Sequence, residues 1–317
     1  MYNYENYSRV KYEIERRRNE AERDADVRAE EMRMKSPEIR AIDEELSKTG
    51  RLLFKAALCG DDVTPIKERN VELNRRRREL IVSLGYPEDY TDVHHFCKEC
   101  SDTGYVNGGR VCRCLKEELI KATIASSGMG NLIEKQSFDN FLVDIYKNDH
   151  KVYEHMQRVV QMAKKYVKNF AEKKENLLLI GTTGTGKTHI STAIAKEIIK
   201  QGYDVVYDSI QNIISDFETD KFKSGYSGGE PRSDKYLECD LLIVDDLGTE
   251  FNTPFSLSCI YNLINTRQNK GLPTIISTNL SAKEISQKYE DRIYSRIMGV
   301  DYRPLHFIGD DRRINNI

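Results

Sequence analysis

The chain has 317 residues, of which 39% are apolar and 32% charged, with 49 basic against 51 acidic residues. This length allows two or three domains, and the apolar fraction is sufficient for a folded core. The net charge of −2 gives no overall basic surface, so any contact with DNA must be local. No apolar run approaches about 18 residues, and the first residues lack the layout of a signal peptide, so we expect a cytoplasmic protein without membrane contact.

Residues 1 to about 90 are charge-rich and helical in pattern, without a glycine before Gly50. Ser36-Pro37 and Thr64-Pro65 each predict a helix start, with a capping hydroxyl before a proline. Apolar residues then recur on one face of each predicted helix, at Ile39, Ile42 and Leu46 and at Ile66, Leu73 and Leu80. We therefore predict a helical region over residues 1–90.

The next segment contains four of the seven cysteines, at Cys97, Cys100, Cys112 and Cys114. The two close pairs flank a hairpin-like, glycine-containing insert, and four thiolates in such a pattern are typical of a structural Zn²⁺ site. His94 or His95 in place of one thiol is an alternative, and so are four buried thiols without metal. We predict a zinc module over residues 91–120, too small to hold a core of its own.

From about Asn176 onward, short apolar runs alternate with helical stretches. The predicted strands cover residues 177–180, 205–207, 241–244, 274–277 and 305–308. Gly202 is expected to end one intervening helix, and Ser281 with Glu284 forms a capping box for another. This alternation predicts an α/β fold, with a parallel five-stranded sheet between helices in a domain over residues 121–317. Ligands of such a sheet bind beyond the carboxyl ends of its strands.

A P-loop follows the first of these strands, because residues 181–188 match G-x-x-x-x-G-K-[ST] between a strand and a helix. Its backbone N–H groups and the helix N-terminus are suited to a polyphosphate. Lys187 is expected to reach the β- and γ-phosphates of ATP, and the Thr188 hydroxyl to ligate Mg²⁺. The predicted nucleotide-binding residues are Gly181, Thr182, Thr183, Gly184, Thr185, Gly186, Lys187, Thr188 and His189. A glycine-rich turn that only joins strand to helix is the alternative.

Two later strands end in polar residues that complete an ATPase pattern. Asp245 and Asp246 follow the apolar run 241–244, as in a Walker B strand. Asp245 is predicted to hold the Mg²⁺ shell, and Asp246 to orient or deprotonate the attacking water. Because many ATPases have the longer Glu at the second place, Glu250 remains an alternative base. Asn279 is expected beside Asp246, where it can bond the water or the γ-phosphate.

Arg292 and Arg296 are four residues apart and share one helix face. Arg296 fits an arginine finger that acts on the γ-phosphate of a neighbouring subunit, and a surface ion pair is the alternative. The stretch 223–229 is read as an ordinary connection, with a contact surface for a DNA strand as the second interpretation.

These motifs, in this order, resemble the AAA+ ATPases of the DnaC/DnaI helicase-loader and IstB type. The resemblance rests on residues 136–141, the P-loop, and residues 245–248, 277–280, 292–296 and 307–313, and it covers about residues 91–317. The four-cysteine module is similar to that of Gram-positive DnaI-type loaders. By motif position the resemblance implies that Asn279 is sensor 1, Arg296 the arginine finger and Arg313 the sensor 2 arginine, with Arg303 and Arg312 as alternatives to the last.

The resemblance further implies a function in DNA replication. An ATPase of this type would load a DnaB-type hexameric replicative helicase onto single-stranded DNA, self-associate through its ATPase domain, and bind the helicase through residues 1–90. An IstB-like ATPase that assists transposition is the alternative. A nucleotide-switched adaptor is less consistent with the set Asp245, Asp246 and Asn279. A small-molecule kinase would need a lid-like arginine cluster between P-loop and Walker B, which this sequence lacks.

Overall fold

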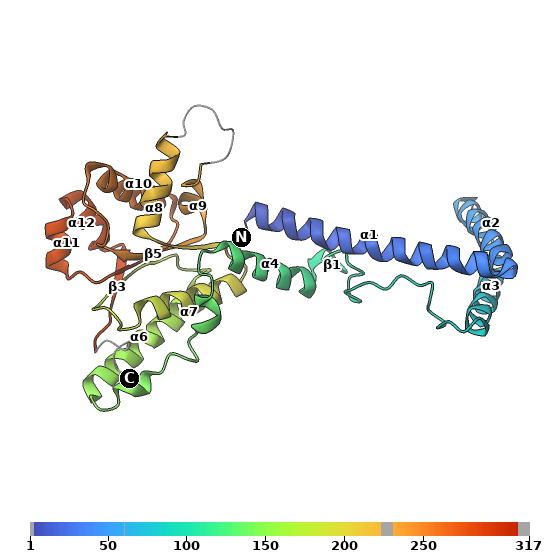
Figure 1. Ribbon diagram of the computed structural model, residues 1–317, viewed down its shortest axis with the longest axis horizontal. Coiled ribbons are helices and arrows are strands. Elements are labelled where there is room, and N and C mark those ends of the chain that lie inside the picture. Colours follow the sequence, from blue (N-terminus) through green and yellow to red (C-terminus); the bar gives the residue numbers. More distant parts are fainter. Residues whose placement is uncertain (1–2, 60, 223–230, 310–317) are drawn as a thin grey trace. The chain divides into compact units, whose positions relative to one another are not determined.

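The computed structural model describes residues 3–59, 61–222 and 231–309 (Figure 1). The chain divides into two compact units, Lys11–Leu115 and a second unit that combines Met1–Val10 with Lys116–Ile317. Helices α1 (Tyr4–Lys35) and α4 (Arg113–Ser126) each contribute to both units. In the described ranges, no helix is both long enough and apolar enough to cross a membrane. The functional division at residues 90 and 120 stays a prediction.

The first unit is mainly helical, and it contains most of α1 together with α2 (Pro37–Cys59) and α3 (Thr64–Ser83). Its small core includes the fully buried Met32, Ile39 and Ile81. The predicted start of α2 is confirmed, since the Ile39 N–H donates to the Ser36 hydroxyl at 3.2 Å. The predicted Thr64 cap is wrong: Thr64 lies inside α3 and donates its own N–H to the Asp62 carboxylate at 2.9 Å. A carboxylate two residues upstream therefore replaces the hydroxyl at this helix end.

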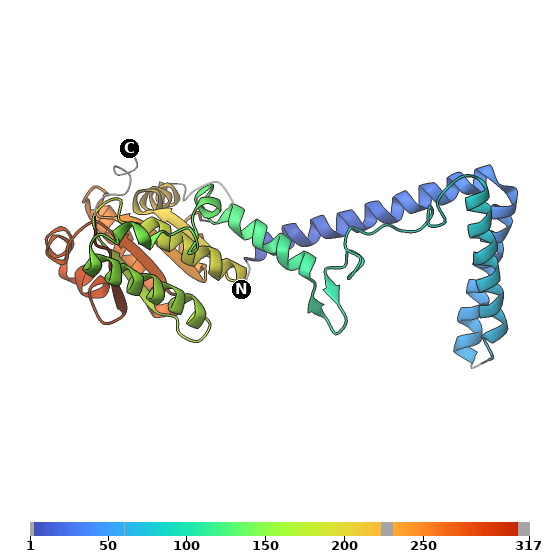
Figure 2. The same ribbon diagram turned by 90° about the horizontal axis from the view of Figure 1, so that it is seen from below.

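The same unit contains the cysteine segment, folded around a two-stranded hairpin (Figure 2). β1 (Tyr105–Val106) pairs antiparallel with β2 (Arg110–Val111), which confirms the predicted hairpin-like insert. Gly108 and Gly109 form the turn with φ of 79° and 75°, a left-handed conformation that glycine adopts without strain.

The second unit is built on a five-stranded sheet, and all its neighbouring strands pair in parallel. The strand order is β4-β5-β6-β3-β7. The bounds are β3 (Asn176–Ile180), β4 (Val205–Ser209), β5 (Leu241–Leu247), β6 (Thr274–Thr278) and β7 (Tyr302–His306). This confirms the predicted fold class. The last strand begins and ends earlier than predicted, so Ile308 lies beyond it.

Helices cover both faces of this sheet, and the strands alternate their side chains between two cores. One core packs Leu177, Leu179 and Ile243 against α6 (His150–Asn169) and α7 (Lys187–Lys200). The other packs Leu178 and Leu242 against the helices that follow β4, β5 and β6. Those helices are α8 (Ile210–Phe222), α9 (Asp234–Glu238), α10 (Pro254–Lys270), α11 (Ala282–Lys288) and α12 (Asp291–Ile297). Two short elements precede α6, namely α5 (Leu132–Lys135) and a 3-10 turn (Val143–Tyr146).

Two helix ends in this unit follow the sequence prediction. Ser281 and Glu284 form the predicted capping box at the start of α11, with both reciprocal bonds present. Gly202 follows α7 with φ 97°, the left-handed conformation expected after a helix end. These ends fix where the connections between strands and helices run, and with them the position of the loops at the carboxyl edge of the sheet.

Candidate functional site

The P-loop lies between β3 and α7, where the sequence predicts it. Gly184 and Gly186 have φ of 77° and 96°, which glycine adopts freely. A Cβ at Gly186 would lie 2.6 Å from the Phe141 ring, so the loop packs closely against the segment that precedes α6. The buried Thr185 hydroxyl donates to the Thr182 carbonyl at 2.8 Å and fixes the loop from inside. The loop is therefore rigidly supported before any nucleotide enters.

A pocket of about 220 Å³ opens over this loop. It joins the P-loop to the ends of β5 and β6, and is lined by Gln136, Thr183, Gly184, Gly186, Lys187, Thr188, His189, Asp246 and Asn279. The predicted residues of three strand ends thus meet in one cavity. Gly181, Thr182, Thr185 and Asp245, which the sequence also predicts for the site, are not among the residues that line it.

Lys187 connects the P-loop with the end of β6. Its ammonium group donates to the Asn279 amide oxygen at 2.6 Å and to the carbonyls of Gly181 and Thr182 at 2.7 and 2.9 Å. The side chain is buried, which leaves its charge little solvent. Phosphate oxygens are stronger acceptors for an ammonium than neutral carbonyls, so the pocket is chemically suited to a phosphate.

Asp245 accepts hydrogen bonds on both carboxylate oxygens. The Thr188 hydroxyl donates to Oδ2 at 3.2 Å, as expected for residues that share a metal, and the Tyr207 hydroxyl donates to the same oxygen. The Ser277 hydroxyl donates to Oδ1. A P-loop hydroxyl beside a strand-end carboxylate is an arrangement that holds Mg²⁺, so Thr188 and Asp245 fit the predicted magnesium site. Sequence reasoning missed Tyr207 and Ser277, which are ordinary strand residues by pattern.

Asp246 has a left-handed backbone with φ 54°, at a bulge between Val244 and Leu247 opposite β6. The bulge re-aims its side chain into the pocket, while its N–H donates to the Ser277 hydroxyl at 3.0 Å. Glu250 is buried instead, and accepts from the Gly248 N–H at 2.8 Å and the Tyr289 hydroxyl at 2.5 Å. This arrangement favours Asp246 over Glu250 as the base.

His189 holds the segment before α6 against the P-loop helix. Its Nε2 donates to the Ser137 carbonyl at 2.9 Å and lies 3.0 Å from the Asn140 amide oxygen. The Phe141 ring meets the imidazole edge-on, with centroids 5.1 Å apart. Residues 136–141, which the sequence singles out only by resemblance, therefore pack beside the P-loop, and Gln136 lines the pocket.

Arg296 lies outside the pocket lining of its own chain. Its guanidinium donates to the Gln268 amide oxygen at 2.9 Å and lies 5.3 Å from the centroid of the Tyr261 ring. Arg303, on β7, lies 3.7 Å from the Glu175 carboxylate. Arg312, Arg313 and the stretch 223–229 lie outside the described residues.

The four predicted cysteines meet at the base of the β1–β2 hairpin, with all four sulfur atoms within 4.8 Å of one another. The Cys97 and Cys112 sulfurs are 3.8 Å apart, and those of Cys100 and Cys114 are 3.4 Å apart. Tetrahedral Zn²⁺ with sulfur ligands at about 2.3 Å separates them by about 3.8 Å, so this cluster fits Zn²⁺. Burial raises the pKa of the Cys112 thiol, because it disfavours the thiolate that a metal would stabilise.

The residues around the cysteines order the first ligand pair. The buried Asp102 carboxylate accepts from the N–H groups of Phe96 and Cys97, both at 2.8 Å. His95 Nδ1 lies 3.6 Å from Asp102, whereas the group of metal-ligating atoms contains cysteine sulfurs alone among the residues described. The structure therefore favours four thiols over the alternative with a histidine.

Comparison with known proteins gives low-identity matches, some of them to proteins named as helicase loaders. Replicative helicase loader DnaC of Escherichia coli (strain K12) is 24% identical over 178 residues, covering 56% of this chain and 69% of that protein. Phage-like element PBSX protein XkdC of Bacillus subtilis (strain 168) is 25% identical over 243 residues, covering 70% and 86%. The crystal structure of DnaI is 21% identical with a TM-score of 0.45, and covers 59% of this chain and 95% of that one. The crystal structure of the DnaC helicase loader is 24% identical with a TM-score of 0.44, and covers 49% of this chain and 90% of that one.

A family model described as IstB-like ATP binding protein matches residues 142–300. The matched range spans half of the chain and contains the P-loop, Asp245, Asp246 and Asn279. The family is the one that the order of motifs predicts, and its description states ATP binding. This chain belongs to the family of IstB-like ATP-binding proteins.

Proposed function

We propose that this chain is an ATP-hydrolysing loader that delivers a hexameric replicative helicase to single-stranded DNA. The observation that carries the proposal is the pocket in which the P-loop, Asp246 and Asn279 meet, with Lys187 bonded to Asn279. Relatives named replicative helicase loaders support the loading part. The proposal places helicase binding in residues 1–90, a zinc module in 91–120 and ATPase activity in 121–317.

Within the pocket, the proposed roles follow the chemistry of each group. Lys187 and the P-loop N–H groups bind the phosphates of ATP, and Thr188 with Asp245 holds Mg²⁺. Asp246 accepts the proton of the attacking water, and Asn279 orients that water or the γ-phosphate. The bound Mg²⁺ supplies charge neutralisation on the phosphates. Arg296 and Arg313 are proposed to act as arginine finger and sensor 2.

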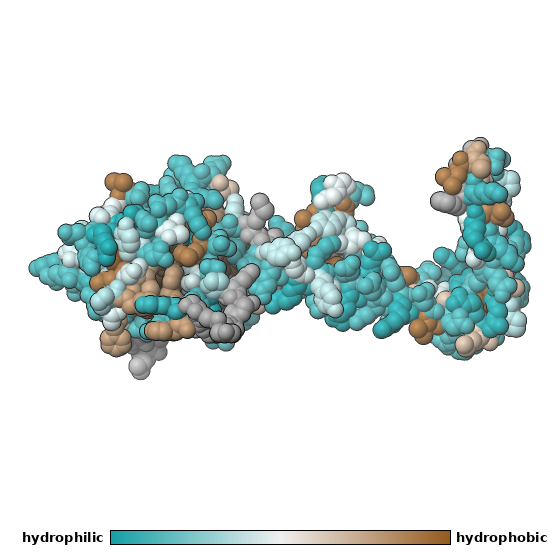
Figure 3. All heavy atoms as spheres, turned by 90° about the horizontal axis from the view of Figure 1, so that it is seen from above, coloured by the Kyte–Doolittle hydropathy of each residue, from teal (hydrophilic) through white to brown (hydrophobic). Residues whose placement is uncertain are grey.

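The helicase contact is proposed to use the α2–α3 hairpin. Leu52, Leu58 and Val71 are exposed by 54%, 74% and 69%. Figure 3 shows hydrophobic residues gathered at the end of this hairpin. Apolar side chains that stay in water at the end of a helical pair are suited to a partner protein.

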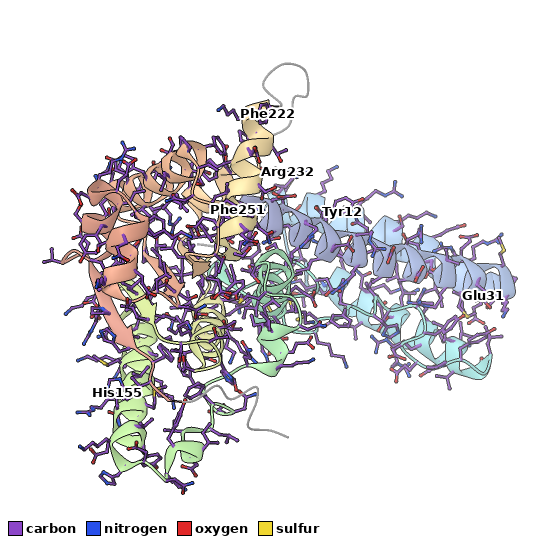
Figure 4. All side chains as sticks on the ribbon, turned by 60° about the vertical axis from the view of Figure 1, so that its left-hand side comes forward. Tyr12, Glu31, His155, Phe222, Arg232 and Phe251 are labelled. Atoms are coloured by element: carbon purple, nitrogen blue, oxygen red, sulfur yellow. The ribbon has the colours of Figure 1, made fainter. Side chains whose placement is uncertain are left out.

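Single-stranded DNA is the second partner in the proposal. Phe222 at the end of α8 and Phe251 after β5 are exposed by 77% and 88% (Figure 4). Exposed aromatic rings stack on bases without sequence preference. Arg232, whose N–H donates to Asp220 of α8 at 3.0 Å, adds a cation that lies 3.8 Å from the Asp216 carboxylate. Local features of this kind are needed because the whole chain has a net charge of −2.

Affinity capture of the intact chain from its host lysate with ATP present tests the proposal. We expect the replicative helicase to co-purify with the wild type and to be lost with Leu58→Ser. Leu142→Ser is the matched control, since Leu142 is 63% exposed and belongs to the other unit. Capture without a helicase, or equal capture by Leu58→Ser, would contradict the proposed partner or its contact.

The alternative function is that of an IstB-like ATPase that assists DNA transposition, and the description of the matching family favours it. The same capture distinguishes the two functions, because a transposase would then co-purify in place of the helicase. The proposed pocket and its residues serve either function equally.

A further inference from the structure

Tyr207 lies beside the proposed magnesium ligand on the neighbouring strand. In the β4–β5 pair it stands opposite Ile243, two residues before Asp245. Strand residues two apart share a face, so Tyr207 and Asp245 both face the layer that contains α7, where Thr188 forms the first turn. The ring is buried in this core, with 9% of the residue exposed.

The hydroxyl of Tyr207 completes a set of three donors around Asp245. Thr188 and Tyr207 donate to one carboxylate oxygen, and Ser277 donates to the other. A carboxylate that accepts on both oxygens cannot rotate without losing a bond. Thr188 is also the proposed metal ligand, and the Ser277 hydroxyl also accepts from the Asp246 N–H, so neither serves the carboxylate alone.

The backbone of Tyr207 is itself fixed by the segment that follows α4. Its N–H donates to the Ser127 carbonyl at 2.7 Å. A Cβ added at Gly128 would lie 2.3 Å from the Tyr207 carbonyl oxygen, so the two segments touch directly.

We infer that Tyr207 is a positioning residue for Asp245: its hydroxyl holds the carboxylate in the orientation that binds Mg²⁺ with the nucleotide. The inference rests on the proposed Mg²⁺–nucleotide site. It adds to that site a residue that contacts a metal ligand rather than the metal, and that none of the sequence motifs contains. Outer-shell partners of metal-binding carboxylates orient the ligand, and their removal commonly costs about tenfold or more in metal affinity.

The test compares nucleotide affinity with and without the metal. A fluorescent ADP is titrated into the full-length chain, once in Mg²⁺ and once in EDTA, for the wild type, Tyr207→Phe and Tyr166→Phe. The Phe substitution removes one oxygen and keeps the ring in the core. Tyr166 is the matched control, because its hydroxyl is also buried and has no hydrogen-bond partner among the residues described.

We expect Mg²⁺ to tighten binding to the wild type and to Tyr166→Phe, and this enhancement to fall about tenfold in Tyr207→Phe, with affinity in EDTA unchanged. The concentration of Mg²⁺ that half-saturates the effect should rise by the same factor. An unchanged enhancement, or an equal loss with and without Mg²⁺, would show a merely structural hydroxyl and overturn the inference. If Mg²⁺ does not change the nucleotide affinity of the wild type, the proposed metal site is overturned as well. The wild-type titration thus distinguishes failure of the proposed site from failure of the inference about Tyr207.

Discussion

Asp246 occupies a backbone conformation that restricts which acid can stand at the end of β5. At φ 54°, a side chain beyond Cβ crowds the backbone, and Asp and Asn tolerate this region better than longer residues. The bulge that creates this conformation also turns the carboxylate into the pocket. An Asp at the second Walker B position can therefore act as the base. The backbone conformation brings its short side chain into the pocket, where a longer Glu side chain would otherwise be needed.

Asp246→Asn should bind ATP and lose turnover by about 10²–10⁴-fold, because Asn keeps the shape and the left-handed backbone but cannot take a proton. Lys187→Ala should lose nucleotide affinity as well, since it removes the cation from the phosphate site. Nucleotide titration and phosphate release measure the two effects. Glu250→Gln is the control and should keep most of the turnover, as its carboxylate serves Gly248 and Tyr289. Full hydrolysis by both Asp246→Asn and Lys187→Ala would contradict these roles.

At the scale of elements, the apolar runs predict the strands well because a parallel sheet buries both faces of each strand. The prediction placed β7 too late in the sequence, because Arg303 and Pro304 lie inside this strand and interrupt the apolar pattern. The burial of Arg267 could not be predicted from the sequence pattern. Its guanidinium donates to the backbone carbonyls of Tyr236 and Pro273, both at 2.8 Å, and every residue has such a carbonyl, so the sequence does not mark these partners. The same holds for Tyr207, whose partner lies on another strand.

We expect the cysteine hairpin to depend on a metal for its stability. Among its residues Cys100 and Cys112 are buried, yet the hairpin strands are two residues long and offer little apolar surface. We expect near-stoichiometric zinc in protein purified without chelator. Cys100→Ser should loosen residues 91–118, as seen by faster amide exchange there, while nucleotide binding persists. Cys59→Ser is the matched control, since Cys59 is exposed and remote in sequence from the cluster. A folded, metal-free native protein would contradict the zinc site.

At the scale of the whole molecule, the described part of one chain contributes one buried lysine and no arginine to the lining of the pocket. Charge that develops on a γ-phosphate needs further cations, and a neighbouring subunit can supply them. Arg296 is available for this, because among the described residues its guanidinium contacts the Gln268 amide oxygen and the Tyr261 ring. An active site shared between subunits would link turnover to assembly, which suits the proposed loading of a hexameric helicase.

If Arg296 acts in a neighbouring subunit, ATPase activity per chain should rise with protein concentration or on addition of a helicase ring. Arg296→Ala should bind ATP normally, because its own pocket is intact, yet turn over about 10³-fold more slowly.

Mixing Arg296→Ala with Lys187→Ala provides the decisive measurement. In a mixed interface the first chain supplies the pocket and the second supplies the arginine, so phosphate release should partly return from two inactive proteins. Arg292→Ala is the matched control, since Arg292 stacks on the same Tyr261 ring at 5.0 Å and should remain active. The shared site would be contradicted if no mixture recovers phosphate release and if wild-type activity per chain does not depend on concentration or partner. Arg296 would then act only within its own subunit.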